Sequence, residues 1–558
     1  HRPAEKSRRR HLQQPPARLL PGRLSLKSIA DLFNGALRPI ILSIDLGTSG
    51  MKVALITIYG KVIGWDSEPI QLYLTPDGGA EQSPDEWWRA FITAAQRLIG
   101  RGLTAPSRIK AVCCSTQGEG TIPVNRAGKA LMNCVLWMDM RGAANLRQQF
   151  GGVIKVSGLG AQHVLRWIGL TGGMPSATGK DPAAHMLLIR DRYPEVYAQT
   201  YKFLNVLDFL NLQLTGRFTA TVDSILTSWV TDNRNPDNIH YDSGLVRSCG
   251  VAGDKLPEIV PCTAVLGPLV PSVAAQLGLI SEVKVVAGAI DNTAAAIGAG
   301  AIEDYIPHLY IGTSSWLAAH VPYKKTDVFA SLASVPCAVP GRYLLTALQA
   351  TAGGNLTYLR DNIIYNKDEL LQEAQVPDIF KVLDQIAARV PAGANGVIYT
   401  PWIWGERAPV EDKALRAGLY NLSLRNTRED IIRAFLEGIA LNTRWVLEPM
   451  DRFMGRKTRS IHIVGGGAQS DIWCQIFADA LNVEIKQVAG PVYANACGAA
   501  WIGAVGLGEI GFNDIPGLVQ FKRLYEPQQA NTSIYDERFA IFTRIYRQMK
   551  GIYHQLNR

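Results

Sequence analysis

The 558-residue chain lacks an apolar run that could serve as a membrane-spanning helix, and it carries little charge. One uncharged stretch, residues 487–508, contains five Gly, one Pro, one Asn and one Gln, which makes it too polar and too rich in small residues to span a bilayer. Charged residues make up only 19% and hydrophobic residues 47%, so the chain can bury large cores and is not disordered. We expect a soluble protein of two to four domains.

Cysteine is scarce and shows no ligand pattern. The eight Cys residues include no C-x-x-C pair, and no His stands at zinc-finger spacing from them. The pattern therefore indicates neither a structural zinc site nor a disulfide framework. We therefore expect reduced, mostly buried thiols and a cytoplasmic location.

The body of the chain also lacks a strong charge of one sign. Residues 1–38 hold seven Arg and two Lys against one Glu and one Asp, a local charge of +7, so the other 520 residues carry only +2 of the total of +9. A nucleic-acid-binding body is thereby disfavoured. We expect residues 1–38 to form a disordered basic leader, with a transit-type presequence as the alternative. No apolar segment follows the charges, which disfavours a secretory signal.

No G-x-x-x-x-G-K-[ST] motif occurs, which excludes a P-loop NTPase. From residue 39 onward, short β-branched runs alternate with longer helical patterns, which is typical of α/β proteins. Ser470 is placed to cap the helix that follows it. Strands are predicted at residues 40–44, 52–57, 109–114, 283–290, 308–311, 396–400 and 461–464, and helices at 84–99, 181–191, 428–453 and 471–481.

A strand, Gly-Thr-Ser turn, strand pattern occurs twice, with turns at residues 47–49 and 312–314, 265 positions apart. The repeat predicts two related halves that face each other across a cleft, with a boundary near residue 300. Gly allows close backbone approach, and exposed N–H groups with two hydroxyls form a concavity that suits anions. Either turn alone could be an ordinary β-turn, but the pair favours a polyphosphate held between two lobes.

Two acidic residues stand at strand ends. Asp45 precedes the first turn, where a carboxylate beside phosphates implies an intervening Mg²⁺; the alternative is that Asp45 caps the turn. Asp291 follows a buried strand and opens a small-residue helix, whose N-terminus favours an ionised carboxylate. Such a group can accept a hydroxyl proton as that oxygen attacks phosphorus, and the alternative is a simple N-cap.

A third glycine segment, residues 465–467, lies between a strand and the capped helix, a geometry that suits nucleotides; a packing turn is the alternative. Taken in order, residues 45–49, 137–141, 291–295, 312–314, 465–470 and 497–500 resemble the FGGY family of carbohydrate kinases, and the segment from 418 to 437 resembles that family's C-terminal signature. The resemblance covers residues 39 to about 540.

The resemblance implies a two-lobed, actin-like α/β fold, a duplicated ribonuclease-H-like architecture with ATP and Mg²⁺ in the interdomain cleft. Residues 39–300 would form the N-terminal sugar-binding lobe and 301–540 the C-terminal nucleotide-binding lobe, with a helical tail at 541–558. Asp291 corresponds to the catalytic base, Asn292 to its neighbour at the substrate, and Asp45 to the acidic residue near Mg²⁺. The positions that correspond to nucleotide contacts are Gly47, Thr48, Ser49, Gly312, Thr313, Ser314, Gly353, Gly354, Gly466, Gly467 and Gln469.

The family's substrate loop corresponds to residues 115–121, where Gln117, Gly118 and Glu119 are placed to meet vicinal hydroxyls; the alternative is that Glu119 only caps the loop. Xylulose kinases commonly have Met-His-Gly here and glycerol kinases Gln-Arg-Glu, and neither pattern matches fully. Residues 136–139 and 205–210 look more like xylulose kinases.

We therefore predict ATP-dependent phosphorylation of a pentulose, such as D-xylulose to D-xylulose 5-phosphate. The alternatives are a kinase for glycerol, ribulose or another ketose, a sugar sensor without turnover, and a non-kinase actin-like ATPase module. The expected partners are a small sugar and ATP, with no nucleic acid and no membrane, and a homodimer is left open.

Overall fold

The structure is a computed structural model that describes residues 38–365 and 379–557. The predicted leader, apart from Arg38, lies outside the described residues. The described residues from Pro39 onward belong to one compact unit. None of the helices in the described ranges combines the length and the apolarity that a membrane crossing needs.

The first half is built on a six-stranded sheet in the order β16-β17-β6-β1-β2-β3. β1, β2 and β3 follow one another directly, helices separate β3 from β6, β6 from β16 and β16 from β17, and the central strand β1 is fully buried. The bounds are β1 (Ile40–Leu46), β2 (Gly50–Thr57), β3 (Val62–Pro69), β6 (Ile109–Thr116), β16 (Val265–Pro268) and β17 (Lys284–Ile290).

The second half is built on an eight-stranded sheet in the order β20-β21-β22-β19-β18-β25-β26-β27. The bounds are β18 (Pro307–Ile311), β19 (Ser315–Val321), β20 (Thr326–Asp327), β21 (Leu332–Pro336), β22 (Tyr343–Gln349), β25 (Ser460–Val464), β26 (Glu484–Val488) and β27 (Phe521–Tyr525).

The two sheets share one strand plan. Reading β3-β2-β1-β6-β17-β16 in the first sheet and β22-β19-β18-β25-β26-β27 in the second, successive pairs are antiparallel, antiparallel, parallel, parallel and antiparallel in both. The Gly-Thr-Ser turns join β1 to β2 and β18 to β19, at equivalent places in this plan. The prediction of two related halves is confirmed.

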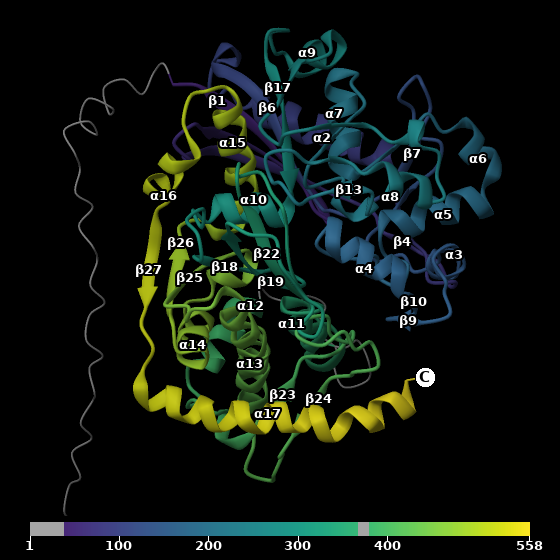
Figure 1. The fold of residues 1–558 in the computed structure, drawn as a ribbon. Coiled ribbons are helices and arrows are strands. Elements are labelled where there is room, and N and C mark those ends of the chain that lie inside the picture. The colour runs from purple at the N-terminus through teal and green to yellow at the C-terminus, as the bar shows by residue number, and fades with distance from the viewer. Residues whose placement is uncertain (1–37, 366–378, 558) are drawn as a thin grey trace, which may run out of the picture. The chain divides into compact units, whose positions relative to one another are not determined.

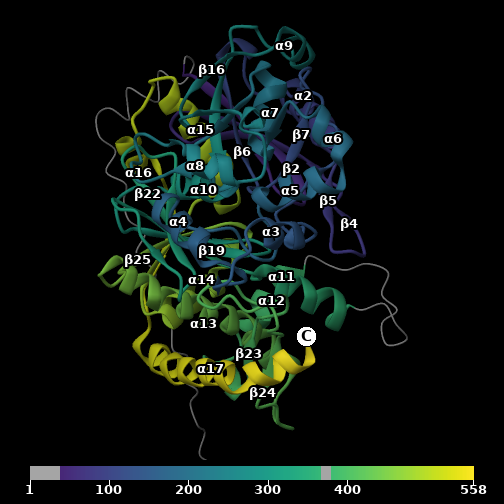
Figure 2. The same cartoon turned by 45° about the vertical axis from the view of Figure 1, so that its right-hand side comes forward.

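Helices cover both sheets and also join them. In Figures 1 and 2, α10 (Asp291–Gly298) lies between the sheets, and α15 (Ala494–Gly506) packs beside it. A buried apolar cluster combines Ile41 and Val286 from the first sheet, Trp316 from the second, and Ala295 and Ala499 from these two helices. The two halves therefore share a core around α10 and α15.

The long helices of the second half stand on the far side of its sheet. α17 (Gln529–Leu556) packs against α13 (Arg428–Met454) and α14 (Asp471–Leu481), and in Figure 1 it runs across the view below them. The other helices are α2 (Pro84–Gly100), α3 (Ala143–Gln149), α4 (Ala161–Leu170), α5 (Pro182–Arg192), α6 (Pro194–Gln199), α7 (Val206–Thr215), α8 (Ser243–Ser248), α9 (Pro271–Leu277), α11 (Gly353–Tyr358), α12 (Ile379–Ala387) and α16 (Ile515–Leu518).

All strands and helices predicted from the sequence are present, with ends shifted by two residues at most; the prediction at 396–400 corresponds to β23 (Ile398–Thr400). Ser470 caps α14 as predicted, since its hydroxyl accepts a hydrogen bond from the Trp473 N–H at 3.1 Å. The boundary predicted near residue 300 falls between α10 and β18. The boundary predicted at residue 540 falls inside α17, which begins earlier.

Candidate active site

The first Gly-Thr-Ser turn is fixed by side chains around Thr48. The Thr48 hydroxyl donates to Gln117 Oε1 at 2.8 Å and accepts from Trp137 Nε1 at 3.2 Å, while Gln82 Nε2 donates to the Thr48 carbonyl at 2.6 Å. The Gly47 N–H closes the turn on the Gly50 carbonyl at 3.0 Å. Ser49 at the tip is exposed. The turn is therefore held rigidly with its tip free.

Gln117 is tied into this network on both sides of its amide. Its Nε2 donates to Gln82 Oε1 at 2.8 Å, its Oε1 accepts from Thr48, and the side chain is only 3% exposed. Both amide atoms of Gln117 thus already have protein partners, and the substrate hydroxyls expected to bind Gln117 would compete with Thr48 and Gln82 for them. In this structure Gln117 joins the first Gly-Thr-Ser turn to the loop of residues 115–121.

Gln82, at the end of β5 (Ala80–Gln82), escaped the sequence analysis. It is fully buried and bonds Thr48, Gln117 and the indole of Trp87. Thr48 lies 34 positions and Gln117 35 positions from Gln82 in the chain. No local sequence pattern therefore identifies Gln82.

Asp45 does not cap the turn. Its carboxylate is 3.5 Å from Lys52 Nζ, and its Oδ1 accepts a hydrogen bond from Asn495 Nδ2 at 3.4 Å. Lys52 stands directly opposite Asp45 in the antiparallel β1–β2 pair, and Asn495 lies in the first turn of α15. The capping alternative is wrong, and Asp45 instead connects the first sheet to a helix of the second half.

Asp291 is the first residue of α10, and the N-cap is Ile290, so the N-cap alternative for Asp291 is wrong. A register shift in the β17–β6 pair between Val286 and Ala289 sets where β17 ends. At the bulge, Gly288 has φ +78°, and a Cβ there would lie 2.1 Å from the Cys114 carbonyl oxygen. Only glycine fits this position.

The pKa of Asp291 is raised from 3.8 to about 7. Burial is the main cause, the negative charges of Asp45, Glu119 and Asp223 add to it, and the Asn292 N–H opposes it. The helix N-terminus was expected to favour the ionised form, but burial and three carboxylates outweigh it. The result is a carboxyl group that gains and loses its proton near neutral pH.

Asn292 offers a free acceptor beside this carboxyl. Its Oδ1 is buried and has no hydrogen-bond partner among the described residues. Buried polar atoms are rarely left unpaired. This atom is therefore suited to a ligand hydroxyl.

The loop of residues 115–121, the expected substrate loop, follows β6 and lies next to Asp291. Thr116 pairs with Ile290 in the parallel β6–β17 ladder, and a Cβ on Gly118 would lie 3.6 Å from Ile290 Cδ1. Glu119 has φ +60°, a left-handed conformation that is uncommon for a residue with a side chain and clusters at functional sites.

The Glu119 carboxylate accepts no hydrogen bond from the described residues, so the loop-cap alternative is wrong. Burial raises the pKa of Glu119, while the positive charges of Arg407 and Lys180 oppose the rise and Glu411 adds to it. Arg407 and Glu411 belong to the second half. Charged groups of both halves thus lie near Glu119.

The second turn joins the predicted Gly353–Gly354 segment. Gly312 N–H donates to the Ser314 carbonyl at 2.9 Å, Gly353 N–H to the Gly312 carbonyl at 2.9 Å, and Gly354 N–H to the Thr313 carbonyl at 3.0 Å. A Cβ on Gly353 would lie 2.6 Å from the Gly312 carbonyl oxygen. The start of α11 therefore packs on the turn, whose Thr313 is exposed.

The Gly465–Gly467 turn lies against the end of β18. A Cβ on Gly465 would be 2.5 Å from the Ile311 carbonyl oxygen, and one on Gly467 2.4 Å from Ile311 Cγ2. Gly466 and Gln469 are exposed. Within the described ranges, no hydrogen bond connects these two residues to Asp45 or Asp291.

Tyr310 connects the second turn to both acidic residues. Its ring stacks on Trp316 at 4.0 Å, and a Cβ on Gly312 would lie 2.7 Å from its Cε1. Burial raises the pKa of Tyr310, and the charges of Asp45 and Asp291 raise it further. Tyr310, which packs on the second turn, is therefore close enough to Asp45 and Asp291 to feel the charge of both carboxyl groups.

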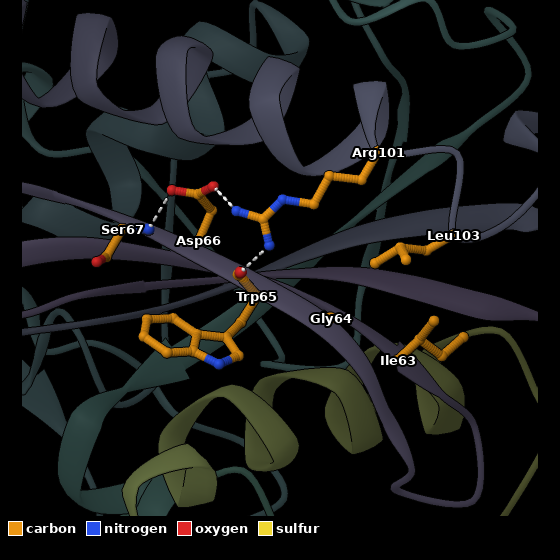
Figure 3. A pocket seen from close by; sticks show the side chains of 7 residues that line it. All are labelled: Ile63, Gly64, Trp65, Asp66, Ser67, Arg101 and Leu103. Carbon is orange, nitrogen blue, oxygen red and sulfur yellow. Dashed lines mark hydrogen bonds and ion pairs between the residues drawn. The ribbon is translucent and has the colours of Figure 1, made fainter.

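A cavity of about 550 Å³ lies elsewhere, at the outer edge of the first sheet on β3. In Figure 3, Arg101 reaches the Asp66 carboxylate and donates to the Trp65 carbonyl, the latter at 3.0 Å. The charges in this cavity are paired with each other, and none of the predicted site residues lines it.

Two family models match the chain in sequence order. The N-terminal domain model of the FGGY family of carbohydrate kinases covers residues 40–298, and the C-terminal domain model covers residues 309–507. The chain belongs to the FGGY family of carbohydrate kinases. This kinase is accordingly an ATP-dependent phosphotransferase with an alcohol acceptor, and the non-kinase ATPase alternative falls away.

Relatives of this kinase carry more than one substrate name. It is 29% identical over 521 residues to a xylulose kinase of Staphylococcus epidermidis, covering 92% of this chain and 98% of that protein. It is 26% identical over 529 residues to a gluconokinase of Bacillus subtilis, covering 92% and 97%. The crystal structure of a ligand-bound xylulose kinase from Lactobacillus acidophilus has the same fold, with a TM-score of 0.80, 23% identity, and coverage of 93% and 100%.

Proposed function

We propose that this kinase transfers the γ-phosphoryl group of ATP to a terminal hydroxyl of a neutral pentulose, with D-xylulose giving D-xylulose 5-phosphate. The xylulose kinases among the relatives support this substrate. Glu119 in the substrate loop supports it as well, because an acidic side chain repels an aldonate but accepts hydrogen bonds from a neutral sugar. Gluconate is the second candidate, since Lys180 and Arg407 lie near Glu119 and could offset a substrate carboxylate.

Asp291 is the proposed general base. It takes the proton of the acceptor hydroxyl as that oxygen bonds to the γ-phosphorus, while the bond from this phosphorus to the bridging oxygen breaks and ADP leaves. The observation that carries the proposal is the position of Asp291 on α10, where it interacts with Asp45, Glu119 and Tyr310 and its pKa is raised to about 7. A base is most effective when its pKa lies near the working pH.

The two turns are the proposed phosphate contacts. Ser49 and Thr313 are exposed at the tips, so their hydroxyls and N–H groups are free to meet phosphate oxygens. Thr48 holds the first turn in place through its side chain, and Gly353 and Gly354 shape the second turn. Gly466, Gly467 and Gln469 are proposed to contact the adenosine.

Mg²⁺ is proposed to lie near Asp45. The described residues contain no group of three or more His, Cys, Asp or Glu side chains that could hold a metal ion. A single carboxylate still fits, because Mg²⁺ binds through one or two carboxylates together with waters and substrate phosphates. The bound ion would neutralise phosphate charge, and Asp45 is already anchored by Lys52 and Asn495.

A substrate screen tests the proposal. ADP release is measured with D-xylulose, D-ribulose, D-gluconate and glycerol at saturating ATP, with Asp291→Asn as the background control. We expect kcat/KM for D-xylulose to exceed that for D-gluconate by about 100-fold or more, the scale set by mismatched polar groups in a pocket. A preference for D-gluconate would overturn the substrate and leave the kinase assignment intact.

A further inference from the structure

A buried carboxylate, Asp223, stands directly behind Asp291 and belongs to no segment singled out in the sequence. It follows β12 (Thr219–Thr221) and is 1% exposed. Its Oδ2 accepts a hydrogen bond at 3.0 Å from the backbone N–H of Ile290, the residue immediately before Asp291. Asp223 and Ile290 are 67 positions apart in the chain.

The Ile290 N–H requires such a partner because of how β17 ends. The register shift between Val286 and Ala289 breaks the regular ladder to β6 just before this point. Ile290 is also the N-cap of α10, and the first N–H groups of a helix have no partner within the helix. A buried N–H without a partner is costly, and here the Asp223 carboxylate supplies that partner.

Asp223 is itself held in place from the opposite side. Its Oδ1 accepts hydrogen bonds from the Thr221 hydroxyl at 2.6 Å and from Cys262 Sγ at 3.4 Å. Thr221 is the last residue of β12, which pairs in parallel with β15 (Glu258–Val260). Cys262 follows shortly after the end of β15. Burial raises the pKa of Asp223, and the hydrogen bonds from these groups and from Ile290 oppose that rise. The carboxylate therefore acts as a fixed point between two strands and the end of β17.

We propose that Asp223 is a positioning residue for phosphoryl transfer: by holding the Ile290 N–H, it fixes the backbone from which the Asp291 side chain is aimed at the acceptor hydroxyl. The inference rests on the proposed role of Asp291 as the base. Asp223 makes no hydrogen bond to the Gly-Thr-Ser turns or to residues 117–119 in the described ranges. Its loss should therefore slow the chemical step and leave substrate binding nearly unchanged.

The test compares Asp223→Ala with Asp223→Asn. Asn has the same shape, can accept from the Ile290 N–H through Oδ1, and can donate to Thr221. Because a displacement of about 1 Å in a reacting group can cost about 100-fold, we expect kcat of Asp223→Ala to fall by about 10- to 100-fold. We expect Asp223→Asn to restore kcat to within about threefold of wild type, and both variants to keep each KM within about twofold.

Asp479 in α14 provides the matched control. It is another buried carboxylate, 1% exposed, and it accepts hydrogen bonds from the Gln528 N–H and from the Asn531 side-chain amide, both at 2.8 Å, with no bond to β12 or β17 among the described residues. Asp479→Ala should lower the melting temperature about as much as Asp223→Ala while leaving kcat within about threefold. An equal loss of kcat in both variants would reduce Asp223 to a general stability role and overturn the inference.

Thr221→Val keeps the test decisive if Asp223→Ala does not fold. It removes one hydrogen bond to Oδ1 and leaves the carboxylate in place, and we expect kcat to fall by about threefold or more with unchanged KM. If Asp291→Asn is inactive, a wild-type kcat in Asp223→Ala overturns the positioning role. Where Asp223→Ala does not fold, a wild-type kcat in Thr221→Val overturns it instead. An active Asp291→Asn instead refutes the base itself, so the two failures are distinguishable.

Discussion

Gly298 of α10 and Gly498 of α15 lie at the same helix crossing. Neither position has room for a side chain, because the backbone of the other helix fills that space. A Cβ on Gly298 would lie 1.8 Å from the Ala494 carbonyl oxygen, and one on Gly498 would lie 1.9 Å from the Ala294 carbonyl oxygen. α10 begins with Asp291, and the first turn of α15 carries the Asn495 that bonds Asp45. This close crossing therefore fixes the two acidic residues relative to each other.

Gly298→Ala tests the crossing. The added methyl group would overlap backbone atoms, which cannot move aside as a side chain would, so we expect a loss of about 3 kcal/mol of stability and a lower kcat. Gly551→Ala in α17 is the control, because nothing lies within 4 Å of its Cβ position, and it should stabilise the protein by up to about 1 kcal/mol. Urea unfolding measures both, and equal effects of the two substitutions would show that the crossing is loose.

Gln82→Ala tests the network beneath the first turn. The substitution leaves the Thr48 carbonyl, the Gln117 amide and the Trp87 indole without this partner. We expect a loss of about 1–3 kcal/mol and a rise in the KM for ATP larger than the rise in the KM for sugar. Gln96→Ala, at an exposed position on α2, should change neither quantity. Steady-state kinetics with each substrate varied in turn measures the two KM values separately. An unchanged KM for ATP would show that this hydrogen-bond network does not contribute to nucleotide binding.

The pH profile tests the environment of Asp291. A base with a pKa of about 7 is protonated below that pH, so kcat/KM should fall about tenfold per pH unit on the acidic side and level off above pH 7. The measurement is kcat/KM for the sugar at saturating ATP between pH 5 and 9. An acidic limb centred near pH 4 would mean that burial and the neighbouring carboxylates do not act on the base as described.

The same carboxyl group should weaken the folded state at high pH. Its folded pKa of about 7 lies above the ordinary value of 3.8, so its contribution to folding is most favourable below pH 3.8 and is lost as the pH rises through 7. Asp291→Asn removes this penalty. After allowance for solvent contact, we expect about 2 kcal/mol of added stability at pH 8 and much less at pH 5. Thermal unfolding at the two pH values measures the difference, and an equal effect at both would contradict it.

The sequence predicts those parts of this fold that depend on local pattern. The two Gly-Thr-Ser turns, the strand ends that carry Asp45 and Asp291, and the cap at Ser470 follow from turn chemistry and from the alternation of strands and helices. Because the turns repeat, the sequence also predicts that the two halves are related, as their equivalent strand plan shows.

The rest depends on contacts between distant segments. Asn495 bonds Asp45 across 450 positions and Asp223 bonds Ile290 across 67, and no spacing rule connects them. The register shift that places Asp291 at the start of α10 instead of at its N-cap depends on the close approach of Gly288 to β6. The pKa of Asp291 sums burial with charges from three segments, so the helix N-terminus alone predicts the wrong direction.

The most direct measurement is the turnover of Asp291→Asn beside its affinity for ATP, determined by titration on the same preparation. If Asp291 removes the acceptor proton, kcat should fall by about 10²- to 10⁴-fold, while the dissociation constant for ATP stays within about threefold because both turns remain intact. Turnover within tenfold of wild type, with ATP binding retained, would contradict the assignment of Asp291 as the base.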